Sequence, residues 1–226
     1  MKQKKILFKF IILVGIALSS FSYSQEQAST TEDKIKELVK GWTALITQKT
    51  GMEPTVTVNP DLALQAGLTY NDKEVSFYFT KGLLDKSEDV ALLIACHKIG
   101  QVLGKVYMDP KPGNTKKSAT RGESDYFGGM CLRKYFERHP KNISSNYNIC
   151  KQSAACNYVI QTALTMFNGE PTKENFSEQT LLLNLPKVTT TIQTYPSNQC
   201  RFQTIYAGII MSGRPACWYF KTGSII

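Results

Sequence analysis

The chain has 226 residues, with 27 Lys and Arg against 18 Asp and Glu, six cysteines and two histidines, and a formal charge of +9 at pH 7. A chain of this length can form one substantial domain with a hydrophobic core. Beyond residue 24 the basic side chains are dispersed and occur at most in pairs such as Lys116-Lys117. This pattern is typical of a solvated surface, so we predict no nucleic-acid partner.

The first 24 residues have the pattern of a secretory signal peptide. Lysines precede an apolar run from Phe10 to Leu18, and small residues follow up to Ser24. The run is about half of the roughly 20 residues that a membrane-spanning helix needs. We therefore predict cleavage near Ser24, a periplasmic or extracellular location and no stable membrane insertion afterwards, with an uncleaved N-terminal anchor as the alternative. Without residues 1–24 the chain has 23 basic and 18 acidic residues, a formal charge of +5.

All six cysteines lie beyond this segment, at Cys96, Cys131, Cys150, Cys156, Cys200 and Cys217. An even number of cysteines in an exported chain favours disulfides, although six cysteines permit many pairings. Cys150 with Cys156, and Cys200 with Cys217, are the local pairs that we favour, and the spacing alone selects no connectivity. A cysteine metal site is disfavoured because the chain has no C-x-x-C pair.

The first elements after the signal are a helix and a small sheet. Residues 25–32 are polar and predicted to be disordered, and residues 33–226 are predicted to form a single domain. Apolar residues at helical intervals over residues 33–48 predict an amphipathic helix that docks on a core. Residues 55–58 and 68–79 are rich in β-branched and aromatic side chains, with a polar turn within the second stretch, and predict a small antiparallel sheet.

The rest of the chain is predicted to be mainly helical. A helix starts at Ser87, which is followed by two acidic residues, and it closes on Gly104. Further helices are predicted over about residues 119–137, 150–167 and 199–211, with a variable stretch at residues 169–194. The fold class is therefore α+β, mostly α.

The stretch ACHKIGQVLG, residues 95–104, lies in the helix that starts at Ser87. In zinc peptidases with the motif H-E-x-x-H, two histidines at i and i+4 bind the metal and the glutamate takes a proton from the zinc-bound water. The same register reads HKIGQ in this chain, so one of the two histidines is present. The second histidine of the chain, His139, precedes Pro140 at a predicted helix end, where we expect a capping role.

Several motifs in a fixed order resemble the gluzincin metallopeptidases, and more closely a group of secreted bacterial proteins similar to M48 peptidases. The pattern of that group is approximately ACHELGH-x-LGG, S-x-EGQADYF, K-C-L-R, HP-x-x-QCR and RP-x-CWF. The corresponding stretches here are ACHKIGQVLG, SATRGESDYF, MCLR, YPSNQCR and RPACWYF, within residues 88–220. The resemblance implies zincin-like helices that carry a former metal site.

Residue by residue, the resemblance implies that the catalytic centre is degenerate. The first histidine ligand is retained as His97, whereas the catalytic glutamate matches Lys98 and the second histidine matches Gln101. A protonated lysine has no lone pair with which to accept a proton, so Lys98 does not replace the glutamate.

The other half of the site belongs to the next predicted helix. The third metal ligand of the family, a glutamate, matches Arg121, whereas the aspartate that braces a histidine ligand is retained as Asp125. A cation close to Zn²⁺ is repulsive by several kcal/mol. Because most of the ligands are also missing, we expect the zinc of the family to be lost here.

The acidic residue Glu123 offers an alternative third ligand. Glu123 follows Arg121 by two positions. On a helix, two positions correspond to a rotation of about 200°, so the side chain of Glu123 points away from the face on which Arg121 lies. We therefore expect a polar network instead, in which Asp125 accepts a hydrogen bond from His97 while Glu123, if it faces inward, neutralises Lys98 or Arg121.

We therefore expect an exported pseudopeptidase that has no catalytic residues of its own and binds a peptide or protein ligand in the remaining cleft. Tyr195, which matches a family histidine before the late proline, is a candidate binding residue with Glu123. One alternative is an active secreted zinc hydrolase with an atypical metal site, for which His97 and Glu123 are the candidate ligands. The other is a structural protein in which the former cleft is filled.

Overall fold

The computed structural model describes residues 29–58, 66–107, 116–141, 146–168 and 176–220, so the predicted signal peptide lies outside the described residues. The elements along the chain are α1 (Thr31–Lys40), α2 (Thr43–Thr50), β1 (Thr55–Val58), β2 (Ala66–Tyr70), β3 (Val75–Phe79), α3 (Lys81–Leu84), α4 (Glu88–Leu103), α5 (Arg121–Arg138), η1 (Asn148–Cys150), α6 (Ala154–Asn168), η2 (Glu178–Leu182) and α7 (Asn198–Ile209). Helices dominate and one small sheet is present, which confirms the predicted α+β, mostly α class.

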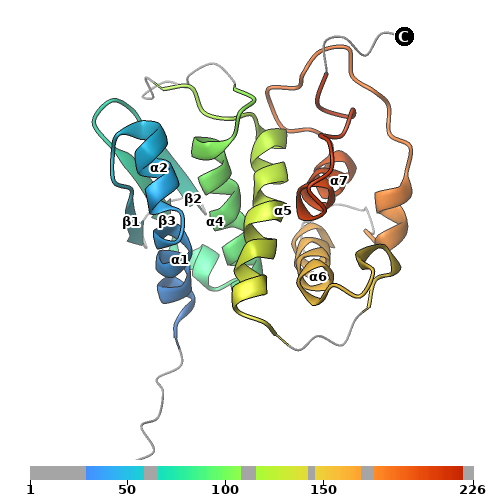
Figure 1. The fold of residues 1–226 in the computed structure, drawn as a ribbon, viewed down its shortest axis with the longest axis horizontal. Helices are drawn as coiled ribbons and strands as arrows, with labels where there is room; N and C mark the ends of the chain where they lie inside the picture. Colours follow the sequence, from blue (N-terminus) through green and yellow to red (C-terminus); the bar gives the residue numbers. More distant parts are fainter. Residues whose placement is uncertain (1–28, 59–65, 108–115, 142–145, 169–175, 221–226) are drawn as a thin grey trace, which may run out of the picture.

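Helices α4 and α5 lie in the middle of the molecule. Figure 1 shows the sheet with α1 and α2 at one end, and α6 with α7 at the other. α5 packs against α4 on one side and against α7 on the other. Within the described residues, no helix combines the length and apolar character needed to cross a membrane.

The sheet is mixed, not antiparallel throughout. β2 and β3 form the predicted hairpin, and the side-chain oxygen of Asn71 accepts the N–H groups of Lys73 and Glu74 in its turn. β1 pairs parallel with β3, which gives the order β1-β3-β2 and makes the antiparallel prediction wrong for β1. The residues of β3 are mostly buried. A buried strand takes the centre of a sheet and pairs along both of its edges, so β3 pairs with β1 as well as with β2.

The N-terminal helical region differs from the prediction in two ways. The helix begins at Thr31, where Thr30 and Asp33 form a capping box, so the last two residues of the predicted disordered segment are helical. The predicted single helix is divided into α1 and α2 at Gly41, because glycine is a weak helix former and Trp42 turns to contact the ring of Phe127 at a centroid distance of 5.0 Å.

The two central helices have the predicted ends. The hydroxyl of Ser87 accepts the N–H of Val90 at the start of α4, and Gly104 ends this helix. The hydroxyl of Thr120 caps α5 in the same way. His139 is the C-terminal capping residue of α5, at the helix end predicted for it, and its ring stacks on the ring of Tyr135.

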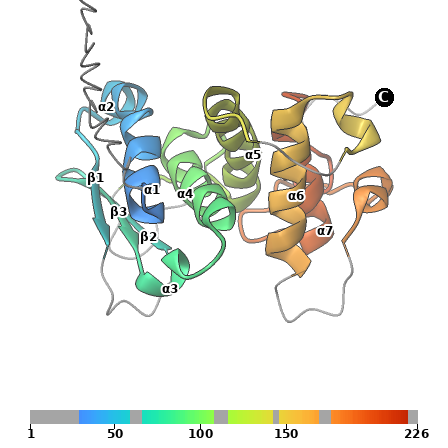
Figure 2. The same cartoon turned by 90° about the horizontal axis from the view of Figure 1, so that it is seen from below.

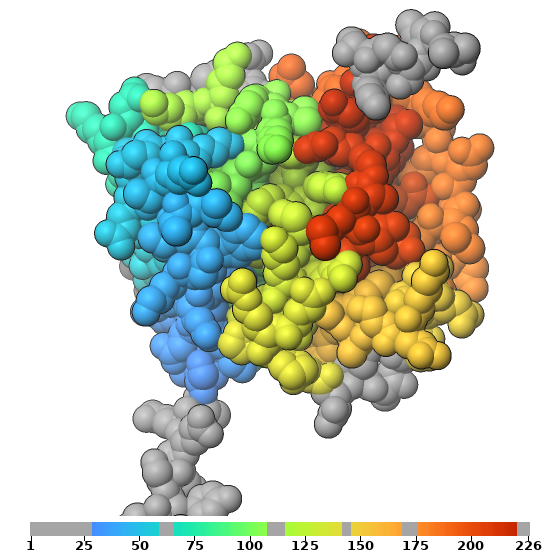
Figure 3. Space-filling view, in the orientation of Figure 1, coloured from blue at the N-terminus to red at the C-terminus, as the bar shows by residue number. Residues whose placement is uncertain are grey.

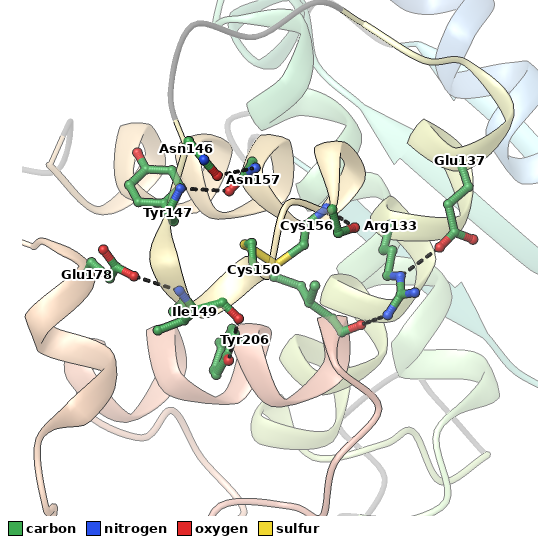
Figure 4. Close-up of a disulfide and its surroundings, with 12 residues drawn as sticks. Arg133, Glu137, Asn146, Tyr147, Ile149, Cys150, Cys156, Asn157, Glu178 and Tyr206 are labelled. Carbon is green, nitrogen blue, oxygen red and sulfur yellow. Dashed lines mark hydrogen bonds and ion pairs between the residues drawn. A yellow bond between two sulfur atoms is a disulfide. The ribbon is translucent and has the colours of Figure 1, made fainter.

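Three disulfides connect the helices, and both favoured local pairs are confirmed. They are Cys96–Cys131 between α4 and α5, Cys150–Cys156 before α6, and Cys200–Cys217 between α7 and the C-terminal segment. Figure 4 shows the second of them, where Glu178 accepts the N–H of Ile149 and the hydroxyl of Tyr206 donates to the Ile149 carbonyl. These contacts bring the loop before α6 against η2 and α7.

Glycines allow α5 and α7 to approach closely. A Cβ atom at Gly208 of α7 would overlap the carbonyl oxygen of Tyr126 in α5, and one at Gly129 of α5 would overlap the carbonyl oxygen of Ile205 in α7. Only glycine fits at such backbone contacts. The close packing fixes α7 beside the helix that carries Asp125.

Candidate functional site

The histidine and the aspartate of the predicted site are in contact. Nδ1 of His97 on α4 lies 2.8 Å from Oδ1 of Asp125 on α5, and the two residues are only 8% and 2% exposed. The predicted hydrogen bond between them is therefore confirmed. The disulfide from Cys96, one residue before His97, joins the same two helices and holds them in register.

The protonation state of His97 follows from its burial. Burial lowers the pKa of His97 to about 4, against the opposing effect of Asp125, so the ring is neutral near pH 7. An ionised carboxylate can only accept a hydrogen bond, so Nδ1 of His97 carries the ring proton and donates it to Asp125. The lone pair of the ring therefore lies on Nε2.

Gln101 occupies this lone pair. Its Nε2 lies 3.3 Å from Nε2 of His97, one helical turn away along α4, and the residue is buried. An amide N–H₂ group is a donor, so it binds the imidazole nitrogen with which a histidine would otherwise hold a metal ion. At the position that the resemblance matched to a second histidine, this chain thus has an amide that caps the nitrogen of His97.

Arg201 of α7 completes the buried cluster. Its Nε lies 2.8 Å from Oδ2 of Asp125 and its Nη2 lies 3.2 Å from Oδ1, which is a bidentate pair. Although burial raises the pKa of Asp125, Arg201 and His97 together lower it to about 2. Sequence reasoning assigned no role to Arg201, and the signal for it was its place in the matched stretch YPSNQCR.

Glu123 faces a different partner from those predicted. This buried residue forms a bidentate ion pair with Arg214, in which Nη2 lies 2.6 Å from Oε1 and Nε also contacts Oε2. Its Oε1 accepts the N–H of Lys105 as well. The prediction that Glu123 neutralises Lys98 or Arg121 is wrong, because the rotation between neighbouring helix positions directs it away from His97.

Tyr195 lies against two arginines. The guanidinium carbons of Arg121 and Arg201 lie 4.9 Å and 4.8 Å from the centre of its ring, within the range of cation–π attraction. The tyrosine is 54% exposed, and Nη1 of Arg121 is buried with no hydrogen-bond partner among the described residues. Tyr195 and Arg121, both predicted site residues, are therefore neighbours at the edge of the cluster.

A cavity of about 250 Å³, here called the His97 cavity, opens beside this cluster. Figure 2 shows the central helix of its wall, α4, between β2 and α6. The lining residues are Ala66, Lys86, Leu93, Ile94, His97, Lys98, Met166, Phe167, Tyr195 and Arg201. Three of them are cations and none is Asp or Glu, so the described lining combines positive charge with apolar surface.

A second cavity, of about 440 Å³, lies where α1 and α2 meet the C-terminal half of α5. Figure 3 shows these helices side by side on one face of the molecule. Its described lining contains none of the predicted site residues. The smaller cavity is thus the one that carries the site chemistry.

The residues present do not fit a zinc centre. In the described part of the chain, no three His, Cys, Asp or Glu side chains are grouped to hold a metal ion. The free nitrogen of His97 faces the donor Gln101, Asp125 is paired with Arg201, and Glu123 is paired with Arg214. All six cysteines form disulfides, which excludes Cys96 as a ligand.

Comparisons of the chain with protein-family models, with curated proteins and with solved structures found no match.

Proposed function

We propose that the protein is an exported pseudopeptidase, in which a binding cavity has taken the place of a catalytic metal centre. The observation that carries this proposal is the cluster around His97, where the metal-binding nitrogen is capped by Gln101 and the bracing carboxylate of Asp125 is held by Arg201. The histidine and the aspartate are surrounded by a donor amide and a guanidinium. The chain would thus keep the scaffold of a peptidase but lack the groups that bind the metal and catalyse hydrolysis.

The lining of the His97 cavity supports binding over hydrolysis. Its described residues include no serine, threonine or cysteine that could act as a nucleophile, and no carboxylate that could act as a general base. The imidazole of His97 is in the lining, but burial lowers its pKa to about 4, so it is a weak base near neutral pH, and its accepting nitrogen is bonded to Gln101. An active zinc hydrolase with Glu123 as a ligand is disfavoured because Arg214 occupies both oxygens of that carboxylate.

Export is supported by two independent features. The first 24 residues have the signal pattern described above. Three disulfides are typical of proteins from an oxidising compartment, such as the periplasm or the extracellular space. A peptide or protein in that compartment is the ligand class that the resemblance to peptidases suggests.

A peptide-retention experiment tests this function. The exported protein is immobilised and exposed to a chymotryptic digest of an unrelated protein, with and without zinc, and the peptides are identified by mass spectrometry. We expect a subset of peptides to be retained intact. Substitution Met166→Trp, which fills the His97 cavity, should abolish retention, whereas Met130→Trp, at a half-buried position that lines a different cavity, should not. Zinc-dependent cleavage, or equal retention by Met166→Trp, contradicts the proposal.

A further inference from the structure

We infer that the molecule has a second binding surface, which docks on an anionic lipid membrane. Two adjoining cavities, of about 440 Å³ and 400 Å³, form this surface and share Trp42, Leu45 and Lys134 in their linings. We call the two cavities together the Trp42 groove. Their described linings have no residue in common with that of the His97 cavity, so the inference goes beyond the proposed function and does not rest on it.

The centre of the Trp42 groove is apolar and open to solvent. The groove lies where α1 and α2 meet α5 (Figure 3). The half-buried ring of Trp42 has its centre 5.0 Å from that of Phe127 on α5, so one side of the ring rests on the core. Leu45 follows Trp42 by three positions, which places the two side chains on the same helical face, and Leu45 is 49% exposed. An apolar group from outside can therefore reach this centre.

Positive charge surrounds the apolar centre. The described linings contain one acidic side chain, Glu37, against four basic side chains, which are Lys40, Lys49, Lys134 and Arg138. Lys40, Lys134 and Arg138 form no ion pair within the described residues, and Nζ of Lys134 lies 5.4 Å from the centre of the Trp42 ring. Four basic side chains against one acidic side chain leave an excess of three positive charges around Trp42.

The combination of cations and exposed apolar side chains matches the surface of an anionic bilayer. The phosphate groups of such a surface attract Lys and Arg, and the layer just below them accepts Trp and Leu side chains. A free inorganic anion would pair with the cations but leave Leu45 in water. Docking of this kind uses side chains at the surface and needs no inserted helix, in keeping with the predicted lack of stable membrane insertion.

The hydrogen-bonding groups of the groove favour a lipid over a polypeptide. Each residue of a polypeptide other than proline brings a backbone N–H donor that needs an acceptor. The charged side chains of the described linings are mainly donors, and the carboxylate and amide acceptors are those of Glu37 and Gln48. The phosphate and ester oxygens of a phospholipid are all acceptors, so they complement Lys and Arg without leaving a donor unpaired.

Vesicle flotation tests the inference. The protein is mixed with vesicles of phosphatidylcholine alone, or of equal parts of phosphatidylcholine and phosphatidylglycerol, and the bound fraction is measured against the lipid concentration. We expect binding to the anionic vesicles to be at least about tenfold tighter than to the neutral ones. Because the attraction is between charges at a surface, an increase in salt from about 0.1 M to about 0.5 M should release most of the bound protein.

Two variants of the groove separate the contributions of charge and apolar contact. The triple variant Lys40→Gln, Lys134→Gln and Arg138→Gln should lose about fivefold in affinity for each cation, or about a hundredfold in all. Leu45→Ser, which changes an exposed side chain, should weaken binding to the same vesicles about fivefold. Circular dichroism verifies the fold of each variant.

A second triple variant is the control for net charge. Lys73→Gln, Lys81→Gln and Lys151→Gln remove the same number of charges at exposed positions outside the groove, and we expect little loss of binding. All variants share the same N-terminal residues, so the differences between them report on the groove.

Three results would each overturn the inference. They are equal binding to neutral and anionic vesicles, an equal loss in the two triple variants, and binding of polyglutamate by the groove without binding of vesicles, which would assign the groove to an acidic protein. Peptide retention by the His97 cavity should be unchanged in both triple variants, so failure of this inference leaves the proposed function intact.

Discussion

Substitution Arg201→Met tests whether the cluster around His97 is held by charge. Arg201 supplies the bidentate bonds to Asp125, a carboxylate that is only 2% exposed. Methionine keeps much of the length and apolar contact of the arginine but has no charge and no donor. In the variant, the donor that remains to Asp125 within this cluster is Nδ1 of His97.

The expected loss of stability follows from the burial of the two partners. Removal of one partner of a buried ion pair costs about 3–5 kcal/mol, because the other charge is left uncompensated. The side chain of Arg201 is 20% exposed, so water screens part of the interaction, and we expect a loss of about 2–4 kcal/mol. In a protein of this size, such a loss lowers Tm by about 10 °C.

The assay is urea unfolding at pH 7 followed by circular dichroism, with the disulfides intact. Lys36→Met is the control, because it removes an exposed ion pair with Glu32, and we expect it to change the stability little. Asp125→Asn added to Arg201→Met should recover part of the stability, since it removes the uncompensated charge. The pKa of His97, followed by NMR, should rise in Arg201→Met because a nearby cation is lost.

Two results together would refute this reasoning. The first is a loss of stability in Arg201→Met no larger than that in Lys36→Met. The second is an unchanged titration of His97 in the same variant. They would mean that the guanidinium of Arg201 does not hold the carboxylate of Asp125 in solution.

Three further predictions concern the titration, the helix packing and a disulfide. The pKa of His97 is about 4, below the value of about 6.5 in an unfolded chain, so the unfolded state takes up the proton first and stability should fall by about 3 kcal/mol as the pH decreases from about 6.5 to 4. Urea unfolding at several pH values measures this slope, which His97→Gln should flatten. Gly208→Ala should cost about 3 kcal/mol or more in thermal unfolding because its Cβ overlaps a carbonyl oxygen of α5, whereas Gly213→Ala, with open space around it, should be nearly neutral. Removal of the Cys96–Cys131 disulfide by alanine substitution of both residues should cost about 2–5 kcal/mol in urea unfolding, and no loss would contradict its role in joining α4 to α5.

The sequence was sufficient where a structural feature depends on neighbouring residues. The ends of α4 were predictable because Ser87 and Gly104 act on the backbone within one helical turn. The division between α1 and α2 was not, because it depends on the contact of Trp42 with Phe127, a residue distant in the sequence. The parallel pairing of β1 was missed for the same reason, since it depends on which strand takes the centre of the sheet.

The candidate site also has one part that the sequence predicted and another part that it did not. The contact between His97 and Asp125 was predictable from the order of the matched motifs. The arginines that complete the site were not, because Arg201 is 76 residues from Asp125 and Arg214 is 91 residues from Glu123. No periodicity or local spacing encodes such pairs, and they follow from the packing of α7 and the C-terminal segment against α5.

Zinc binding at His97 tests the central claim most directly. The protein, purified without chelator, and a variant with Lys98→Glu, Gln101→His and Arg121→Glu are titrated with Zn²⁺ by calorimetry, while NMR follows the His97 ring. We predict that the native protein shows no stoichiometric tight binding and no zinc-dependent shift of His97, and that the variant binds zinc far more tightly. A native protein that carries zinc on Nε2 of His97, or a folded variant that gains no affinity, would contradict the account.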